Sequence, residues 1–539
     1  MNKLYYGDNL TIMQRMPKHH VDLIYMDPPF NSKKNYNLMY RTMTGKPVPE
    51  QVDAFCDTWE MDSEKEQIAN SMPVLMREKG VDDYYVEFWR LWMKALKNTQ
   101  PHLLAYLIYM VQRLLYMKSI LRPTGSIYLH CDPTASHYIK VMMDGIFGHR
   151  NFENEIIWKR TTTHSDSRTW SRVHDTILFY TVGKTFTWNI PRERHSDDYL
   201  SVKYRHDDND GRGLYRLDNM TSPNPRPNMM YEWKGFPYPP KGWRYSKETM
   251  ARLDEEGRVN YPTNDDGTYD TTRRPQLKRY LQEMEGGVMG TVWTDISPIN
   301  SQAQERLGFP TQKPIALLDR IIQASTKKGD RIFDPFCGCG TTIYSAIKNE
   351  REWLGCDIAI LAIKLIKETL ASDRYRMVEG HHFEIDGIPV SVEQAEVLAK
   401  RDPFQFQHWA VERVGGFPMV KKVADRGIDG RMYFETKRGL RDMVISVKSG
   451  LIRPTDIRDL RGVLEREPNA DMGGFISLKE PTRAMKAEAA EAGAFEYQGV
   501  KYDRLQLLTV REILEEKREF HTPTKVQTKI VTGQQSLAL

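Results

Sequence analysis

The sequence predicts an α/β protein built on a doubly wound, mostly parallel sheet. Two apolar runs, Val21–Met26 and Arg331–Phe333, each end in a turn that begins with an aspartate. The first turn reads Asp-Pro-Pro-Phe over residues 27–30, and the second reads Asp-Pro-Phe-Cys-Gly-Cys-Gly over residues 334–340. Doubly wound sheets bind their ligands at the carboxyl ends of their strands. The two turns therefore predict a functional site at that edge of the sheet.

The elements before residue 185 follow from the spacing of apolar residues. The chain starts with an expected strand at Met1–Tyr6. Residues 50–122 carry apolar side chains near helical spacing and predict helices. Strand patterns return at Ser126–His130 and at Thr176–Tyr180.

After about residue 185 the composition and the apolar pattern of the chain change several times. From about residue 185 to residue 300, Pro, Gly, Asn, Asp and Arg are dense, and aromatic residues interleave with basic ones. A loop-rich insert in an enzyme core suits substrate recognition, and an irregular domain with ordinary surface aromatics is the alternative interpretation. The core pattern returns at Leu317–Thr342 and Trp353–Ile366. A separate module is expected from about Pro403, followed by a polar, frayed tail.

The composition is that of a soluble globular protein with two or three domains. The chain has 539 residues, 40% of them hydrophobic and 28% charged. Its net charge of +5 permits nucleic-acid binding without requiring it. Five cysteines, an odd count, indicate a reducing compartment. The apolar stretch 103–117 is too short to span a membrane and contains Arg113. We expect a cytoplasmic protein with no membrane partner.

At its two acidic turns the chain resembles a known family, the amino-directed DNA methyltransferases, which methylate N6 of adenine or N4 of cytosine. The Asp-Pro-Pro-Phe turn resembles the catalytic motif of that family, and Asp334–Thr342 resembles its loop for S-adenosylmethionine. Catalytic motif first, recognition region next and cofactor loop last is the order called the beta class. The resemblance covers residues 1–372 and implies a Rossmann-like methyltransferase sheet.

The resemblance also implies roles for individual residues. The catalytic residues it gives are Asp27, Pro28, Pro29 and Phe30. The cofactor-binding residues it gives are Asp8, Lys313, Asp334, Pro335, Phe336, Gly338, Gly340, Thr341 and Asp357. Asp357 suits the ribose hydroxyls, and Asp334 the amino-acid end of the methyl donor. Asp8 is expected at the adenine end or as a turn aspartate, and Lys313 at the cofactor's carboxylate or as a solvated lysine.

The residue types of the first turn suit methyl transfer to an exocyclic amino group. Asp27 and the carbonyl of Pro28 are hydrogen-bond acceptors for the amino protons, which lets the nitrogen rehybridise toward the methyl donor. Proline has no amide donor and stiffens the backbone, so that carbonyl stays free and fixed. Phe30 offers a stacking face to a base extruded from a duplex. Positioning is then the main contribution, and no covalent enzyme intermediate is needed.

Residues 403–512 carry a second pattern. Asp429 precedes one expected strand and Lys448 lies in the next, as in phosphodiesterases that hold Mg²⁺ on carboxylates. The segment resembles the Mrr-like restriction endonuclease domain of the PD-(D/E)xK fold. That resemblance gives Glu412, Asp429 and Lys448 as nuclease residues and Asp429 as an Mg²⁺ ligand. Ser446 stands where the family has Glu or Gln, and Glu412 or Asp425 would have to compensate. A working nuclease, a DNA-binding relic and an unrelated domain all stay open.

These expectations combine into one domain organisation. It comprises a catalytic half (1–184), a target-recognition region (185–300), a cofactor-binding half (301–372), a nuclease-type domain (403–512) and a flexible tail (513–539).

We expect a site-specific DNA methyltransferase that modifies N6 of adenine in double-stranded DNA, with the target base flipped out. Within the resembled family, an acid at the first motif position goes more often with adenine than with cytosine. The expected context is a restriction–modification system, with a homodimer or a restriction subunit as partner. The alternatives are an N4-cytosine methyltransferase, a methyltransferase of RNA or protein, and a nuclease or DNA-binding effector whose methyltransferase part senses the cofactor.

Overall fold

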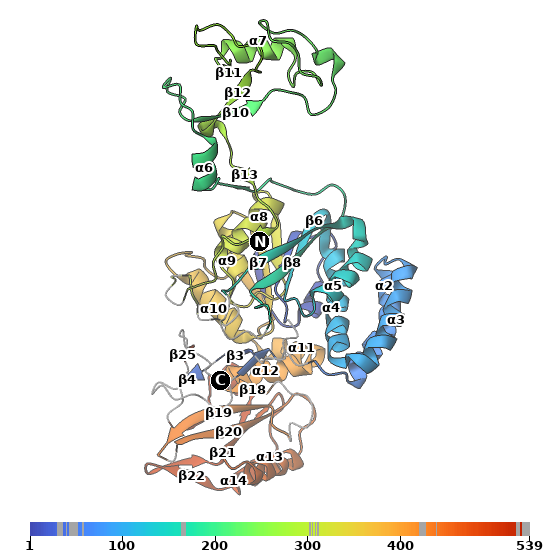
Figure 1. The fold of residues 1–539 in the computed structure, drawn as a ribbon. Helices are drawn as coiled ribbons and strands as arrows, with labels where there is room; N and C mark the ends of the chain where they lie inside the picture. The colour runs from blue at the N-terminus through green and yellow to red at the C-terminus, as the bar shows by residue number, and fades with distance from the viewer. Residues whose placement is uncertain are drawn as a thin grey trace. The chain divides into compact units, whose positions relative to one another are not determined.

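The computed structural model describes most of the chain. The described residues are 1–29, 59–162, 169–300, 303, 305–307, 309, 312–419, 427–437 and 439–523, with the backbone of short strands at 36–38, 40–41, 52–55 and 529–530. The chain divides into two compact units (Figure 1). One contains residues 1–189 and 291–539, and the other contains residues 190–290.

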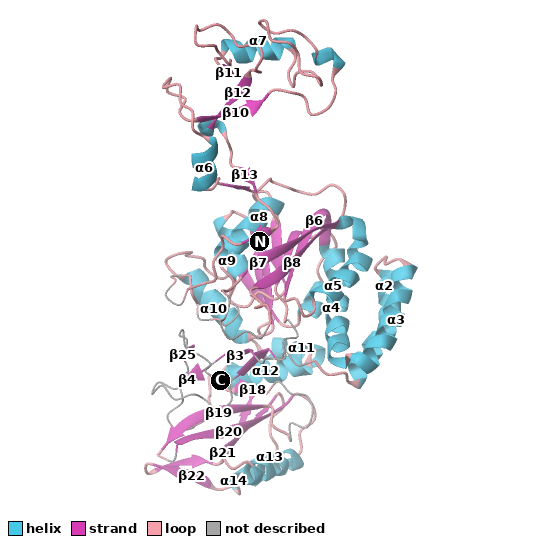
Figure 2. Cartoon of the chain, viewed as in Figure 1, coloured by secondary structure: helices cyan, strands magenta, loops and turns pink. Residues whose placement is uncertain are grey.

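The first unit contains a nine-stranded sheet, which confirms the predicted α/β class (Figure 2). In spatial order its strands are β14 (Val292–Trp293), β7 (Phe152–Lys159), β8 (His174–Thr181), β6 (Leu121–Cys131), β2 (Val21–Met26), β15 (Arg331–Asp334), β16 (Glu352–Asp357), β1 (Asn2–Tyr6) and β17 (Phe383–Asp386). The six strands from β6 to β17 are parallel, and β8 runs antiparallel to both of its neighbours. The sheet extends beyond residue 372, because β17 pairs with β1 at its edge.

Helices cover both faces of this sheet. The helices packed on one face are α8 (Ile315–Ser325), α9 (Thr341–Lys348) and α10 (Ile360–Ala371). Those on the other face are α2 (Ser63–Glu78), α3 (Asp83–Thr99), α4 (Pro101–Ile120) and α5 (Ser136–Met143) (Figure 1). Strand β2 supplies both cores, since Leu23 and Tyr25 belong to the first and Ile24 and Met26 to the second. Alternation along the strand produces this division.

The helical region predicted for residues 50–122 is confirmed over Ser63–Ile120. Asp62 caps α2 by accepting a hydrogen bond of 2.8 Å from the amide of Lys65, and Asp82 caps α3 through the amide of Tyr84. Helix α4 is apolar nearly all round because it is enclosed by the sheet and by α2 and α3.

The second unit lies inside the segment that the sequence marks as an insert. It holds a three-stranded sheet of β10 (Tyr215–Asn219), β12 (Gln276–Tyr280) and β11 (Val259–Asn260), with the helices α6 (Asp197–Lys203) and α7 (Lys247–Glu255). A core of its own surrounds Trp243, which is fully buried, and Trp233 and Phe236. The aromatic residues of this segment therefore serve mainly to fold it.

The C-terminal part forms a five-stranded sheet. Its strands are β18 (Phe417–Pro418), β19 (Gly430–Thr436), β20 (Gly439–Lys448), β21 (Ala470–Ser477) and β24 (Leu505–Thr509). Its helices are α13 (Pro454–Arg466), α14 (Arg483–Ala490) and α15 (Val510–Leu514), with a hairpin of β22 (Ala494–Tyr497) and β23 (Val500–Asp503).

This second sheet is not separate from the first, unlike the module expected from residue 403. Helices α11 (Val392–Arg401) and α12 (Pro403–Arg413) join the two sheets, and one hydrophobic core runs through both. The tail expected from residue 513 also begins later, because Phe520 is only 2% exposed and contributes to that core. No helix of the described residues is long and apolar enough to cross a membrane.

Candidate active site

The two acidic turns lie side by side because their strands are neighbours. Strands β2 and β15 are parallel, with Leu23 opposite Ile332 and Ile24 opposite Phe333. Asp27 follows β2, and Asp334 ends β15. The chain on either side of this pair leaves in opposite directions across the sheet, toward β6 and toward β16. Such a switch point is where open α/β sheets bind ligands.

The two carboxylate oxygens of Asp27 differ in their contacts within the described part of the chain. Its Oδ2 accepts a hydrogen bond from Nζ of Lys313, and the two side chains are 16% and 11% exposed. Its Oδ1 is buried and has no hydrogen-bond partner among the described residues. A buried acceptor that is left unpaired costs free energy. That oxygen is therefore suited to a donor supplied by a ligand.

The rest of the first turn is only partly described. Pro28 is buried and Pro29 is half-buried. The aromatic residue expected to stack on the base, Phe30, lies outside the described residues.

Asp334 organises the second turn from inside. It is buried and accepts hydrogen bonds from the amide of Phe336 at 3.0 Å and from Oγ1 of Thr342 at 2.5 Å. Burial raises the pKa of Asp334 to about 7, and the two donors oppose that rise. Both oxygens thus have partners within the loop, whereas the sequence suggested a contact with the methyl donor.

The glycines of the loop are needed for its shape. Gly340 has φ of +88° and is the last residue before α9, which begins at Thr341 as predicted. A Cβ at Gly340 would lie 2.9 Å from Cγ1 of Ile366. Gly338 also has a positive φ, and its amide donates to Asp357.

Asp357, at the end of β16, connects the glycine loop 334–340 to that strand by a hydrogen bond. Its carboxylate accepts hydrogen bonds from the amides of Gly338 at 2.8 Å and Ala359 at 2.9 Å. Burial raises the pKa of Asp357 to about 6 despite these donors. The carboxylate lines the same pocket as Pro335, Phe336 and Asp8. Four of the nine residues expected to bind the cofactor therefore meet around one pocket.

Asn9 and Tyr109 also line this pocket, and Arg113 holds both of them; none of the three was predicted as a site residue. Arg113 of α4 forms an ion pair with Asp8 at 2.5 Å and donates to Oδ1 of Asn9 at 2.7 Å. Its guanidinium lies 3.4 Å from the centre of the Tyr109 ring. Asn9 in turn donates to the carbonyl of Pro335 at 2.8 Å. A charged residue inside an apolar helix was the signal for this network.

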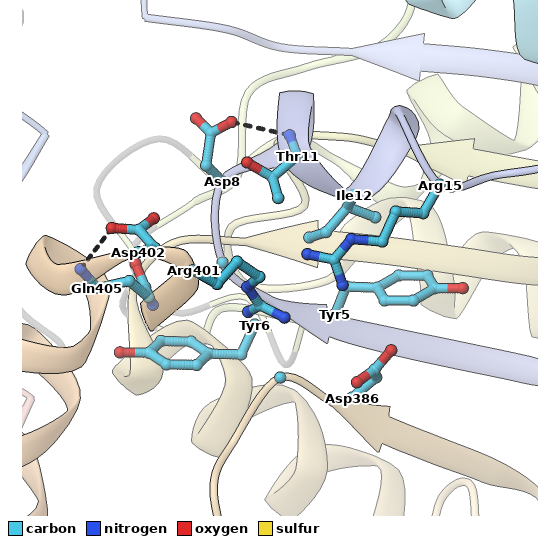
Figure 3. A pocket seen from close by; sticks show the side chains of 12 residues that line it. Tyr5, Tyr6, Asp8, Thr11, Ile12, Arg15, Asp386, Arg401, Asp402 and Gln405 are labelled. Carbon is cyan, nitrogen blue, oxygen red and sulfur yellow. Dashed lines mark hydrogen bonds between the residues drawn. The ribbon is translucent and has the colours of Figure 1, made fainter. Parts of the chain in front are cut away.

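Asp8 has two roles in the structure. It caps the short helix α1 (Asn9–Met13) through the amides of Leu10 and Thr11. It also lines the pocket described above and borders a second pocket (Figure 3). Both interpretations of this aspartate, as a turn residue and as a pocket residue, are thus compatible with the geometry.

The second pocket involves the C-terminal part of the chain. Arg401, Asp402 and Gln405 of α11 and α12 face Asp8 and Arg15 across it (Figure 3). The Nε2 atom of Gln405 is buried there and has no hydrogen-bond partner in the described part of the chain. The C-terminal elements therefore lie beside the turn that carries Asp8.

A buried polar network supports the end of β2. The hydroxyl of Tyr25 lies 2.9 Å from Nδ1 of His130, and Nε2 of His130 lies 3.1 Å from Oδ2 of Asp175. Arg160 also pairs with Asp175 at 3.0 Å. Because β6 and β8 contribute these partners, Tyr25 is fixed near the end of β2.

Lys313 contacts the acid of the first turn. The resemblance implied a place beside the carboxylate of the cofactor, with a capping or solvated lysine as the alternative. In the structure the ammonium of Lys313 donates a hydrogen bond to Oδ2 of Asp27. The two residues come from opposite ends of the methyltransferase segment, and only the fold brings them together.

The residues expected to form a nuclease site do not all lie together. The Oδ2 atom of Asp429 accepts hydrogen bonds from the amide of Val447 at 2.6 Å and from Oγ of Ser446 at 3.4 Å. Ser446 and Lys448 line an open hollow of about 610 Å³. Glu412 does not line it, and instead accepts a hydrogen bond of 3.2 Å from the hydroxyl of Tyr6 in β1.

The expected Mg²⁺ site does not fit these residues. Within the described ranges no group of three or more His, Cys, Asp or Glu side chains is placed to hold a metal ion. Ser446 supplies a hydroxyl where a second carboxylate is needed, and Glu412 faces the other sheet. Asp425 lies outside the described residues.

Comparison with known proteins identifies the family of this chain. A family model described as DNA methylase, covering enzymes that act on N6 or N4 amino groups, matches residues 21–368. The chain belongs to this family.

Individual relatives are similar over part of their length. The type II methyltransferase M.EcaI of Enterobacter cloacae is 30% identical over 276 residues, which are 51% of this chain and 59% of the relative. The Mod subunit of the type III restriction-modification enzyme StyLTI of Salmonella typhimurium is 26% identical over 64% of this chain and 50% of the relative. The chain thus spans between half and three-fifths of these proteins.

Two solved structures are similar to this chain at low identity and low TM-score. The M1.HpyAVI complex with SAM is 13% identical, with a TM-score of 0.29 over 69% of this chain and 100% of that chain. The cytosine-N4-specific PvuII DNA methyltransferase is 11% identical, with a TM-score of 0.30 over 71% of this chain and 88% of that chain.

We predict that Asp27→Ala lowers methyl transfer by about 10²-fold or more, because the buried acceptor Oδ1 is removed. Binding of S-adenosylmethionine should stay near the wild-type value, since the pocket around Asp357 is untouched. Rates with radiolabelled methyl donor and calorimetric titration measure the two quantities. Normal turnover in Asp27→Ala would show that the acid has another role.

We also predict that the free energy of unfolding falls as pH rises from about 4 to about 7. Asp334 has a pKa of about 7 when folded and about 4 when unfolded, so the folded chain binds the proton more tightly in that range. The slope from one such group approaches about 1.4 kcal/mol per pH unit.

The variant Asp334→Asn should lose the contribution of Asp334 to this slope, which extends to about pH 7, and keep those of Asp357 and Glu412. Asp357→Asn should lose only the contribution of Asp357, which extends to about pH 6. Urea unfolding at a series of pH values provides the test. Equal slopes in wild type and both variants would contradict the assignment of these buried acids.

Proposed function

We propose that the protein transfers the methyl group of S-adenosylmethionine to the exocyclic N6 of adenine in double-stranded DNA. One observation carries this proposal: Asp27, at the strand end next to the glycine loop, presents a buried carboxylate oxygen that has no hydrogen-bond partner among the described residues. Membership in the family of N6/N4 DNA methylases supports it.

The cofactor pocket has suitable donor and acceptor groups. Asp357 and Asp8 provide carboxylates at the ends of neighbouring strands β16 and β1, and Phe336 and Tyr109 provide aromatic faces with ring centres 6.4 Å apart. Carboxylates suit ribose hydroxyls and the amino group of an adenine. These residues fit S-adenosylmethionine, which supplies an activated methyl group when bound.

Asp27 and Pro28 then act by positioning the target amino group. Oδ1 of Asp27 accepts a hydrogen bond from the target amino group and turns the nitrogen lone pair toward the methyl carbon. The N–C bond forms while the S–C bond breaks, and the electron pair of the broken bond stays on sulfur. One amino proton leaves toward Asp27 and from there to water. The rigid Pro28 keeps this geometry fixed before the substrate arrives.

Adenine is proposed over cytosine because the first motif position is Asp27, as the resemblance to adenine enzymes implies. The StyLTI Mod subunit named above belongs to a type III restriction-modification enzyme, which supports the same setting for this chain. Residues 190–290, a unit with its own core, are the proposed target-recognition region.

Incubating the purified protein with DNA and S-adenosylmethionine, followed by mass spectrometry of the nucleosides, should yield N6-methyladenine. Asp27→Ala is the control for contaminating methyltransferases. N4-methylcytosine would establish the alternative base specificity. Cofactor binding without any methylated base would instead favour a cofactor sensor.

Grafting residues 190–290 from a relative with another target should move the methylated sequence with the graft. The boundaries follow the compact unit, so both hydrophobic cores remain intact. Sequencing that maps methylated bases reads the result. An unchanged motif would place recognition outside this unit.

The hollow in the C-terminal sheet supports a second proposal, contact with the DNA backbone. Lys448, Arg458 and Arg466 line it together with Asp456 and Asp459. Lysine and arginine are the usual partners of phosphate oxygens. Because the described residues do not fit a metal site, we propose DNA binding without cleavage for this part.

Lys448→Ala should therefore weaken DNA binding, as measured by fluorescence anisotropy, and leave methylation on saturating DNA unchanged. No cutting of unmethylated DNA is expected with Mg²⁺ or Mn²⁺. Cutting by the wild type that Asp429→Ala abolishes would instead establish the nuclease, and Ser446→Glu should then raise it.

A further inference from the structure

The ion pair between Lys313 and Asp27 lies at the centre of the candidate active site. Lys313 comes from the segment that leads into α8, and Asp27 follows β2. Both side chains are largely shielded from water, at 11% and 16% exposure. In such a setting a charge pair is screened much less than on the surface. The pair thus fixes the position of the Asp27 carboxylate at the centre of the site.

Other acids surround this pair. Asp334 is buried at the end of the adjacent strand, and the negative charge of Asp27 helps to raise its pKa. Asp175 interacts electrostatically with Lys313, and Arg160 and His130 also pair with it. Among the described residues, titratable groups with an electrostatic interaction with Asp27 or Lys313 include Tyr25, Cys131, Asp175, Asp334 and Cys339.

Without its ammonium partner, Asp27 would be a buried carboxylate among other acids. Burial and like charges both favour the protonated form of a carboxyl group. A protonated carboxyl carries a donor in place of one acceptor, whereas an ionised carboxylate only accepts. The target amino group is a donor, so it needs the ionised form.

We propose that Lys313 is a positioning residue: its ammonium holds Oδ2 of Asp27, so that Oδ1 is oriented to accept the hydrogen bond of the target amino group. This inference rests on the proposed methyl transfer. It assigns Lys313 to the target side of the site, whereas the sequence suggested the cofactor's carboxylate.

The first test is a stability measurement that needs no activity. Lys313→Met leaves a buried carboxylate uncompensated, so the melting temperature should drop more at pH 7.5 than at pH 5.5. Adding Asp27→Asn should restore the melting temperature at pH 7.5, because the unpaired charge is removed. Lys348→Met is the matched control, since Lys348 pairs with Asp319 between α8 and α9, away from both acidic turns. No coupling between Lys313 and Asp27 would overturn the proposal.

The second test is the pH dependence of methyl transfer. In Lys313→Met the acid limb of the profile of kcat/KM should move upward by about 1–3 pH units, the effect of losing a nearby opposite charge. Lys313→Arg keeps the charge and should restore the wild-type profile in part, and Lys348→Met should leave it unmoved.

The two tests separate the possible failures. A wild-type protein that methylates no DNA contradicts the proposed function, while the melting temperatures still decide whether the pair acts as described. If Lys313→Met instead weakens S-adenosylmethionine binding and leaves the pH profile and the melting temperatures unmoved, Lys313 serves the cofactor and the inference is wrong.

Discussion

The parallel pairing of β2 with β15 is the constraint on which the candidate site depends. It brings residue 27 and residue 334 to the same edge of one sheet, although the recognition-type insert lies between them in the sequence. The two strand ends contribute different groups to the site. The turn after β2 presents an acceptor, and the turn after β15 presents backbone in conformations that only glycine adopts easily. The order of the motifs along the chain does not matter once this pairing forms.

The site concentrates negative charge in a buried place, and the fold compensates for it residue by residue. Lys313 pairs with Asp27, Arg113 pairs with Asp8, and backbone amides donate to Asp357. Asp334 is held by hydrogen bonds from Phe336 and Thr342, and burial raises its pKa to about 7. Removing one partner of such a buried pair is more disruptive than removing both. The buried acids of the candidate site therefore depend on their partners, and the surrounding core keeps these partners in place.

The sequence could predict those parts of the site that depend on local pattern. Strand ends, glycine turns and the start of α9 at Thr341 follow from neighbouring residues, and the structure has them as expected. Contacts between distant segments could not be found this way. Arg113 was recognisable only as a charge in an apolar helix, and the partner of Lys313 depends on how α8 meets β2. Glu412 shows the same limit, since its place beside Tyr6 follows from how the two sheets share a core.

A crystal structure with duplex DNA and a non-transferable analogue of S-adenosylmethionine would test the central claim most directly. The account predicts an extruded adenine whose amino nitrogen lies within about 2.6–3.2 Å of Oδ1 of Asp27. The analogue should then occupy the pocket beside Asp357, with Lys313 still on the other oxygen of Asp27. An Asp27 carboxylate that contacts the analogue, or that lies out of reach of the extruded base, would contradict it.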